Sequence, residues 1–212
     1  LVDTNFVRTG TLLGAAESIR FGVTTVNDMY FFENQIAETL DSTGIRALVG
    51  QVWSTFPLPE DSKLGKNKQT LFENLYEELR GHQRLTACYA PHAPYTCDDE
   101  TLKSIVRIRE RLSAPLHIHV SETKKEVLDS IAQYQMTPVQ RLNSLGILGE
   151  KTICAHSVHV DDRDIEILKQ TNSRIVYNPD SNTKLSSCGS PIPKFLANKI
   201  SVSLGTDGAA SN

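Results

Sequence analysis

The segment LHIHVSET, residues 116–123, combines a strand pattern with the start of a helix. Neighbouring residues of an extended strand point to opposite faces, so His117, His119 and Ser121 share one face while the aliphatic residues between them share the other. Thr123 stands three residues before a glutamate, which is the capping-box spacing of a helix N-terminus. The segment therefore predicts a strand that leads directly into a helix.

The same strand-to-helix pattern recurs along the chain. Helical periodicity separates the apolar segments, and Thr96, like Thr123, is an expected N-cap. Parallel strands require crossover connections, so the alternation predicts a parallel sheet, either an open doubly wound sheet or a (β/α)8 barrel. The predicted strands are 22–29, 46–53, 85–92, 115–122, 152–160, 174–181 and 200–208.

The polar residues favour the barrel. No glycine-rich phosphate-binding fingerprint follows any predicted strand, which argues against an open dinucleotide-binding sheet. Barrel enzymes keep their active sites at the C-terminal ends of the strands, where the polar residues of this chain also lie. We therefore expect residues 1–212 to form one α/β domain, a (β/α)8 TIM barrel segment covering about strands 2 to 8. The first strand and the last helix are expected to be absent from it.

Composition excludes several classes of partner. The chain has 22 Lys and Arg against 25 Asp and Glu, and the net charge of -3 offers no basic footprint for nucleic acid or an anionic membrane. The 4 cysteines are scattered without a C-x-x-C pair, as is typical of buried thiols in a reducing compartment. With no signal sequence and no apolar run of about 20 residues, we expect a cytoplasmic location. We expect the basic stretch from Lys63 to Lys68 to be a solvated loop.

The two histidines of the opening segment are candidate metal ligands. Neutral imidazoles bind zinc, and Glu122 adds acid–base capacity next to His117 and His119. A pair of hydrogen-bonded histidines in a polar barrel interior is the alternative interpretation. The H-x-H pattern alone leaves both open.

Further histidines lie at or near strand ends. His156 and His159 are three residues apart and cannot share a strand face, so we expect one to be functional and choose His156, which is nearer the strand terminus. His92 lies between Pro91 and Pro94, which stiffen its loop. His92 is therefore either a substrate contact or part of a turn-stabilising hydrogen bond.

Asp207 lies at the C-terminal end of the last predicted strand and has glycines on both sides. These small neighbours allow a metal or ligand to approach closely, although an aspartate that closes a turn is the common alternative. Taken together, a histidine on one strand, a histidine on the next and an aspartate on the last predict a metal-assisted hydrolase site.

Six motifs of the chain resemble, in order, those of the amidohydrolase superfamily. Within it they are similar to the 5-methylthioadenosine/S-adenosylhomocysteine deaminases and the related chlorohydrolases. The motifs are FGVTTVNDMYFF, PHAPYTC, HIHVSET, AHSVHV, NPDSNTKLSSCGSP and SLGTDGAASN.

This resemblance implies a metal site. The family holds its metal with an H-x-H pair after strand 1, a histidine after strand 5 and an aspartate after strand 8. The last two correspond to His119 and Asp207, which makes His117 a neighbour rather than a ligand. The strand 1 pair and the family's flanking β-sandwich are absent from residues 1–212. One Zn²⁺ per subunit is the implied cofactor, with Fe²⁺ or Mn²⁺ as alternatives.

The resemblance also implies hydrolytic deamination of an adenosine thioether to the inosine product and ammonia. Asp207 would be ligand and base, His156 would orient the nucleophile, and Glu122 would protonate a ring nitrogen of the purine. Glu122 and Asp207 would also contact the substrate, and His92 its sugar hydroxyls.

Two alternatives stay open. Dechlorination or deamination of another aromatic heterocycle, such as a triazine or guanine, would use the same residues. A metal-free binding paralogue belongs to a different class and would be expected to lose the ligands that this sequence keeps. We expect a small nucleoside substrate and no nucleic-acid or membrane partner, and a homo-oligomer is compatible with the sequence.

Overall fold

The computed structural model describes residues 2–61 and 67–211, which form two compact units. The N-terminal unit consists of Leu1–His92 and Arg107–Leu116, and the C-terminal unit of Ala93–Val106 and His117–Asn212. Within each unit the strands are hydrogen-bonded in the order in which they occur in the chain. Of the helices that the structure describes, none combines the length and the apolar character that a membrane span needs.

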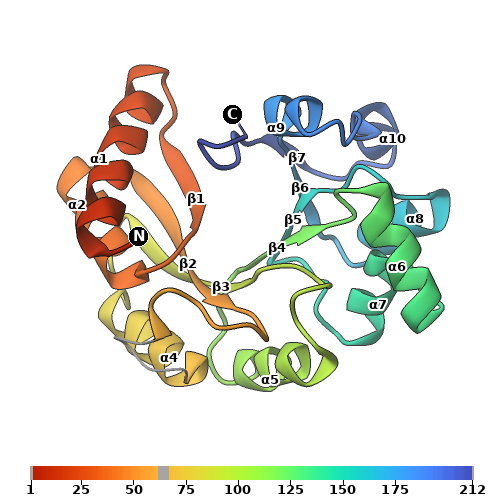
Figure 1. Cartoon of the computed structure of the whole chain (residues 1–212), viewed down its shortest axis with the longest axis horizontal. Helices are drawn as coiled ribbons and strands as arrows, with labels where there is room; N and C mark the ends of the chain where they lie inside the picture. The colour runs from red at the N-terminus through yellow and green to blue at the C-terminus, as the bar shows by residue number, and fades with distance from the viewer. Residues whose placement is uncertain (1, 62–66, 212) are drawn as a thin grey trace. The chain divides into compact units, whose positions relative to one another are not determined.

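The N-terminal unit alternates strands and helices. Its strands are β1 (Thr25–Met29), β2 (Arg46–Trp53) and β3 (Leu85–Pro91), and its helices are α1 (Thr4–Arg20), α2 (Glu33–Thr43) and α4 (Lys68–Glu78). The strands are parallel, with Thr25 opposite Arg46 and Ala47 opposite Leu85. In Figure 1, α1 lies beside α2.

The two faces of β2 carry different side chains. Trp53 packs against Phe72 of α4 and Tyr89 of β3, and the Phe72 and Tyr89 rings are stacked with their centroids 3.8 Å apart. Val52 precedes Trp53 and therefore points to the opposite face, where it joins Ala90 in a small buried apolar cluster. The aromatic rings thus bind α4 to one face of the sheet, and on the other face Leu58, Met29 and Phe31 pack with Val52 and Ala90.

The expectation that the basic stretch is solvated is wrong for Lys68. Its side chain is 9% exposed, and Nζ lies 2.9 Å from Glu60 and 2.7 Å from Asp61. Burial lowers the pKa of Lys68, but the hydrogen bonds to the two carboxylates outweigh it and bring the pKa above its usual value. Glu60 is fully buried, so an ammonium group beside it compensates a charge that would otherwise be unpaired. Residues 62–66 lie outside the described part of the chain.

Glu33 is a second buried carboxyl group of this unit. It is 1% exposed, and its Oε1 accepts hydrogen bonds from Gln51 Nε2 and from the backbone N–H of Val52, each at 3.0 Å. Burial, followed by the charge of Glu60, raises the pKa of Glu33 to about 8. The first turn of α2 is therefore tied to β2 by a carboxyl group that keeps its proton at neutral pH.

The C-terminal unit continues the alternation. Its strands are β4 (Leu116–Val120), β5 (Thr152–His156), β6 (Arg174–Tyr177) and β7 (Val202–Leu204), although Leu116, the first residue of β4, belongs to the N-terminal unit. Its helices are α6 (Lys124–Tyr134), α7 (Pro138–Ser144), α8 (Asp162–Gln170), α9 (Pro179–Lys184) and α10 (Ile192–Ala197). Helix α5 (Asp99–Arg109) begins in this unit. The strands are parallel, with Ile153 opposite Arg174 and Ile175 opposite Val202. Helix α7 contacts both α6 and α8 (Figure 1).

The predicted strands are confirmed in order and direction, but most are shorter than predicted. The strand expected at 152–160 ends at His156, and the one expected at 200–208 is reduced to Val202–Leu204. The backbone φ is 70° at His156, the last residue of β5, and this left-handed conformation ends the extended strand. Asp207, with a φ of 61°, lies three residues after the end of β7.

One of the two predicted helix caps is confirmed. Thr123 Oγ1 accepts the backbone N–H of Glu126 at 3.1 Å and caps α6. Thr96 does not cap α5, because its side chain bonds within the preceding turn. The α5 cap is instead Asp98, whose carboxylate accepts the N–H of Thr101 at 2.8 Å.

Candidate active site

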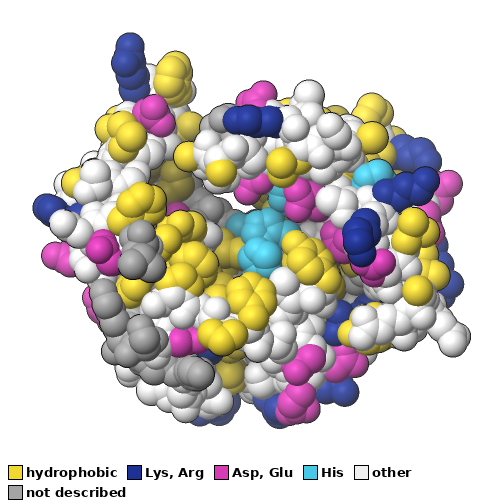
Figure 2. Space-filling view, viewed as in Figure 1, with side chains coloured by type: hydrophobic (Ala, Val, Ile, Leu, Met, Phe, Trp, Pro, Cys, Tyr) yellow, Lys and Arg dark blue, Asp and Glu magenta, His cyan; other side chains and the backbone are white. Residues whose placement is uncertain are grey.

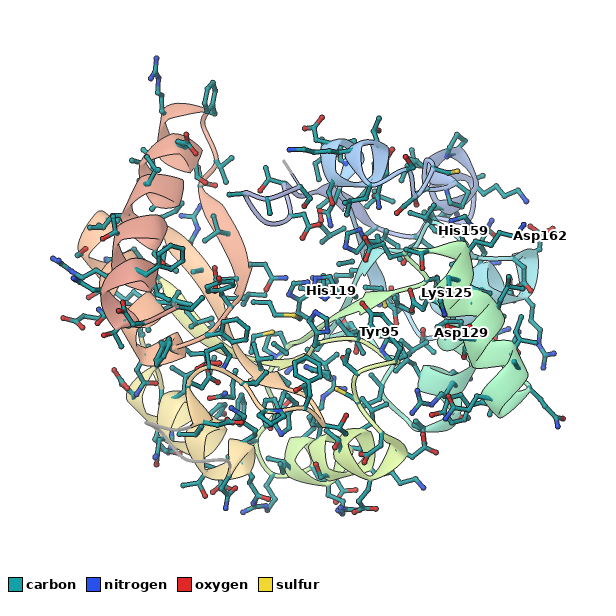
Figure 3. The ribbon with its side chains drawn as sticks, in the orientation of Figure 1. Tyr95, His119, Lys125, Asp129, His159 and Asp162 are labelled. Carbon is teal, nitrogen blue, oxygen red and sulfur yellow. The ribbon has the colours of Figure 1, made fainter. Side chains whose placement is uncertain are left out.

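Strand β4 presents two imidazoles on one face. The His117 and His119 rings have centroids 5.6 Å apart, and the His119 ring lies 5.4 Å from that of His156. Burial, with smaller contributions from His119 and His156, lowers the pKa of His117 to about 3. His117 is therefore a neutral neighbour, and His119, labelled in Figure 3, stands at the C-terminal end of the strand.

His156 is the last residue of β5 and is 1% exposed. Its Nδ1 lies 3.0 Å from Nδ2 of Asn182. Burial lowers the pKa of His156, while Asp207 and the hydrogen bond with Asn182 act in the opposite direction. Figure 3 shows His159 well apart from His119, beyond the end of the strand. The structure thus brings His156, and not His159, to His119.

Asp207 follows β7 and is held by two hydroxyl groups. Ser181 donates to Oδ2 at 2.5 Å, and Ser211 donates to the same oxygen at 3.2 Å. Burial would raise the pKa of Asp207, but the Ser181 hydroxyl and the nearby His156 and His119 imidazoles hold it below its usual value. Asp207 therefore stays a carboxylate and can act as a ligand or a base.

His119, His156 and Asp207 form a cluster that could hold a metal ion. Each offers one ligand atom, and these atoms all lie within 4.8 Å of one another. Imidazole nitrogens and a carboxylate oxygen are a donor set that suits zinc and related divalent ions. Figure 2 shows histidine side chains beside acidic ones on the viewed face. The cluster contains both predicted ligands and adds His156, for which a different role was predicted.

Glu122 approaches the same imidazole from the loop after β4. Its Oε2 lies 3.8 Å from Nε2 of His156, and Asp207 Oδ2 lies 4.0 Å from that nitrogen. Burial raises the pKa of Glu122, with His119 lowering it and Asp207 raising it further. Two carboxyl groups with pKa values displaced in opposite directions are the pattern of an acid–base pair.

The surroundings of the cluster have features of a ligand-binding site. Buried side-chain atoms near it that lack a hydrogen-bond partner among the described residues include His117 Nδ1, Ser121 Oγ, Ser157 Oγ and Asn182 Oδ1. Buried polar groups are normally paired, so these atoms are available to water or to a ligand. The left-handed backbone of Ser121 and Ser157, with φ of 51° and 46°, is a kind of strain that is concentrated at functional sites.

Two side chains that hold the cluster were not expected from the sequence. Ser181 and Asn182 are fully buried in α9, and they bond to Asp207 and His156 respectively. The available signal was the polar segment NPDSN, residues 178–182, at the exit of a predicted strand. Each partner is 26 residues away along the chain, so only the folded structure identifies the pairs.

His92 belongs to the N-terminal unit. Its backbone N–H donates to the carbonyl of Trp53 at 3.0 Å, and its ring meets the Phe56 ring edge-on with centroids 6.4 Å apart. The backbone hydrogen bond ties the end of β3 to the end of β2. The role of His92 toward the substrate stays a prediction.

Comparison with protein sequences gives a consistent result. The model of the amidohydrolase family matches residues 1–212. A 5-methylthioadenosine/S-adenosylhomocysteine deaminase of Caldanaerobacter subterraneus is 44% identical over 205 residues, which cover 96% of this chain and 47% of the relative. A 5′-deoxyadenosine deaminase of Methanococcus maripaludis is 41% identical over 214 residues, covering 100% of this chain and 50% of the relative. The chain thus spans about half the length of the curated relatives it matches.

A solved structure extends this likeness to the fold. The crystal structure of an adenosine deaminase from Xanthomonas campestris with bound zinc matches with a TM-score of 0.94 and 33% sequence identity. The match covers 100% of this chain and 48% of that chain. The expected fold class, a segment of the (β/α)8 barrel of metal-dependent hydrolases, is confirmed.

Proposed function

The chain belongs to the amidohydrolase family, and from this premise we propose that the protein hydrolytically deaminates an adenosine thioether to the inosine product and ammonia. 5-Methylthioadenosine and S-adenosylhomocysteine are the proposed substrates, since both occur in the name of the Caldanaerobacter relative. The Methanococcus relative is named for 5′-deoxyadenosine, which shares the adenine ring and a modified 5′ carbon.

The observation that carries the proposal is the cluster of His119, His156 and Asp207 with Glu122 beside it. Hydrolytic deamination of a purine needs a proton donor for a ring nitrogen and a base for the attacking water. Burial favours the neutral acid at Glu122, while the hydroxyl and imidazole neighbours of Asp207 favour its carboxylate. The two proton-transfer roles can therefore be filled by two carboxyl groups that lie 3.8 Å and 4.0 Å from the same nitrogen of His156.

In the proposed reaction, Glu122 donates its proton to a ring nitrogen and makes the adjacent C6 more electrophilic. Asp207 accepts a proton from the water whose oxygen forms the new bond to C6. His156 donates a hydrogen bond that orients this water. When the bond between C6 and the amino nitrogen breaks, the proton held by Asp207 passes to the leaving ammonia. The remaining proton of the new C6 hydroxyl group leaves as the carbonyl forms and restores the proton of Glu122. Each proton transfer of this kind typically contributes about 10²–10⁴-fold in rate.

We propose that His119 and Asp207 hold one divalent metal ion, with His156 within reach of it. A bound ion of this kind supplies Lewis-acid activation of water near neutral pH. Zinc is the proposed metal, in line with the zinc bound in the Xanthomonas structure, and iron(II) and manganese(II) are the alternatives.

The two rival functions differ in whether they need the acid, the base and the metal ligands of this site. Hydrolysis of a triazine or of guanine would use the same acid, base and ligands, so these residues do not discriminate between substrates. A metal-free binding paralogue has no need of three clustered ligand atoms, and their presence argues against it.

A substrate panel tests the proposal. The complete natural protein, loaded with zinc, is assayed for ammonia release from 5-methylthioadenosine, S-adenosylhomocysteine, 5′-deoxyadenosine, guanine and a chlorotriazine. We expect the highest kcat/KM with one of the two thioethers, and an inosine-type product. Turnover of guanine or the triazine without deamination of any of the nucleosides would overturn the proposal.

A further inference from the structure

Glu126, in the first turn of α6, contacts the loop that carries Glu122. It is 7% exposed, its Oε1 accepts the backbone N–H of Ser121 at 2.8 Å, and its Oε2 accepts that of Glu122 at 2.8 Å. A single carboxylate therefore binds two successive amides. Hydrogen bonds from backbone N–H groups to a charged acceptor are shorter and stronger than neutral ones.

The loop needs such a support because of its conformation. Ser121 has a φ of 51°, a left-handed conformation that is unfavourable for a residue other than glycine. A turn of this kind points consecutive N–H groups at one spot and forms a concave site for an anion. The two carboxyl oxygens of Glu126, supplied by the helix that follows, fill this site.

The same loop is joined to the segment that follows His156. The carbonyl oxygen of Ser121 accepts the N–H groups of Val158 and His159 at 3.0 Å and 2.9 Å. Glu126 thus binds the peptide groups on both sides of Ser121, and the segment after β5 binds the second of them through its carbonyl oxygen. This arrangement fixes the path of the backbone from His119 to Glu122.

We propose that Glu126 is a positioning residue, whose carboxylate fixes the Ser121 and Glu122 amides and thereby holds the Glu122 carboxyl group 3.8 Å from His156 Nε2. Its catalytic consequence rests on the proposed function, because it requires Glu122 to be the proton donor. The structural part of the proposal concerns only the loop and can be measured without substrate.

The first experiment is amide hydrogen exchange in the complete protein without metal, followed by mass spectrometry of peptides that span residues 117–124. E126A removes both acceptors, so we expect the Ser121 and Glu122 amides to exchange about tenfold faster or more. E126Q keeps one acceptor oxygen and turns an NH₂ group toward the other amide, so we expect a smaller increase. If E126A is too unstable to purify, E126Q decides the same question.

Asp164 provides a matched control. It is fully buried, lies in the first turn of α8, and accepts hydrogen bonds from Thr137 Oγ1 at 2.5 Å and from the N-cap amide of Asp161 at 3.3 Å. D164N therefore removes a buried helix-capping carboxylate without touching the β4–α6 loop. We expect D164N to lower the melting temperature and to leave exchange at Ser121 and Glu122 unchanged.

The second experiment is steady-state kinetics of the zinc-loaded protein. Loss of a supporting hydrogen-bond partner typically reduces activity about 10–100-fold, and we expect E126A to lower kcat by this factor with a smaller change in KM and unchanged zinc content. We expect kcat to rank wild type, then E126Q, then E126A, and D164N to keep the wild-type kcat at temperatures where it is folded.

Two results would overturn the proposal. One is unchanged exchange at both amides in a folded Glu126 variant, and the other is a wild-type kcat in E126A despite faster exchange. Should the wild-type protein deaminate none of the nucleosides, the proposed function fails, while faster exchange in E126A but not in D164N still establishes that Glu126 holds the loop.

Discussion

Glu122 and Asp207 approach the same nitrogen of His156 but are held in different states. Burial favours the protonated form of Glu122, whereas the Ser181 hydroxyl and the imidazoles around Asp207 favour its carboxylate. One carboxyl group is therefore suited to donate a proton and the other to accept one. At the scale of single residues, this difference is what the proposed chemistry depends on.

Replacing the base tests one side of this pair. D207N removes the proton acceptor and weakens one ligand, so we expect kcat/KM of the complete protein to fall by about 10²–10⁴-fold or more. The measurement is ammonia release from the preferred nucleoside. D162N, on the outer surface of α8 with its side chain 84% exposed, is the control and should be indistinguishable from wild type. Near-normal activity in D207N would contradict the role assigned to Asp207.

Replacing the acid separates catalysis from metal binding. E122Q keeps the shape of the side chain but has no acidic proton to transfer, so we expect kcat to fall by about 10²–10⁴-fold while one metal per subunit is retained. Kinetics and elemental analysis of the same preparation provide both values. Loss of the metal from E122Q would identify Glu122 as a ligand instead.

At the scale of elements, the short helix α9 and the first turn of α6 serve the site more than they serve the core. Helix α9 supplies Ser181 and Asn182 to the ligand cluster, and α6 supplies Glu126 to the loop of Glu122. Both helices start within a few residues of a strand end. Such a short connection places the first helical turn next to the residues that leave the strand.

Helix α2 is attached to β2 through Glu33, and this contact predicts a pH dependence of stability. The pKa of Glu33 is raised from 4.5 to about 8, so between these values the folded protein keeps a proton that the unfolded chain releases. The free energy of unfolding should therefore decrease as pH rises through this range, by at most about 1.4 kcal/mol per pH unit.

Urea unfolding at several pH values between about 5 and 8 measures this dependence. E33Q keeps the acceptor oxygen for Gln51 and Val52 but cannot ionise, so its stability should vary less with pH than that of the wild type. E38Q, at an exposed position of the same helix, is the control and should keep the wild-type slope. Equal slopes in E33Q and E38Q would show that Glu33 does not titrate as described.

At the scale of the whole molecule, the metal is expected to couple the site to stability. A ligand that binds only the folded state stabilises it by about 2.7 kcal/mol at 100 times its Kd. Chelation should therefore lower the melting temperature of the complete protein, and zinc should restore it. Calorimetry of the chelated and reloaded protein makes the measurement. H119A should show neither effect, and a zinc-induced rise in H119A equal to that of wild type would count against the proposed ligand set.

The sequence by itself determined the order of strands and helices, the parallel sheet and the strand ends at which polar residues gather. These features depend on local pattern, namely the alternation of faces in LHIHVSET and the cap at Thr123. His119, Glu122 and Asp207 were candidates for the same reason, because each stands at or just after the end of an apolar strand, while the choice of His119 over His117 came from the family resemblance.

Only the tertiary structure decided which side chains meet. It brought the His156 ring to that of His119, paired Ser181 with Asp207, and buried Lys68 against Glu60 in a stretch that looked like a solvated loop. Such contacts join residues that are distant in the chain. A charged side chain that is buried must be paired because desolvation is costly, and no local sequence pattern shows which residue will be its partner. Local sequence pattern thus determined the order of strands and helices, and tertiary packing determined the environment on which the protonation state of each carboxyl group depends.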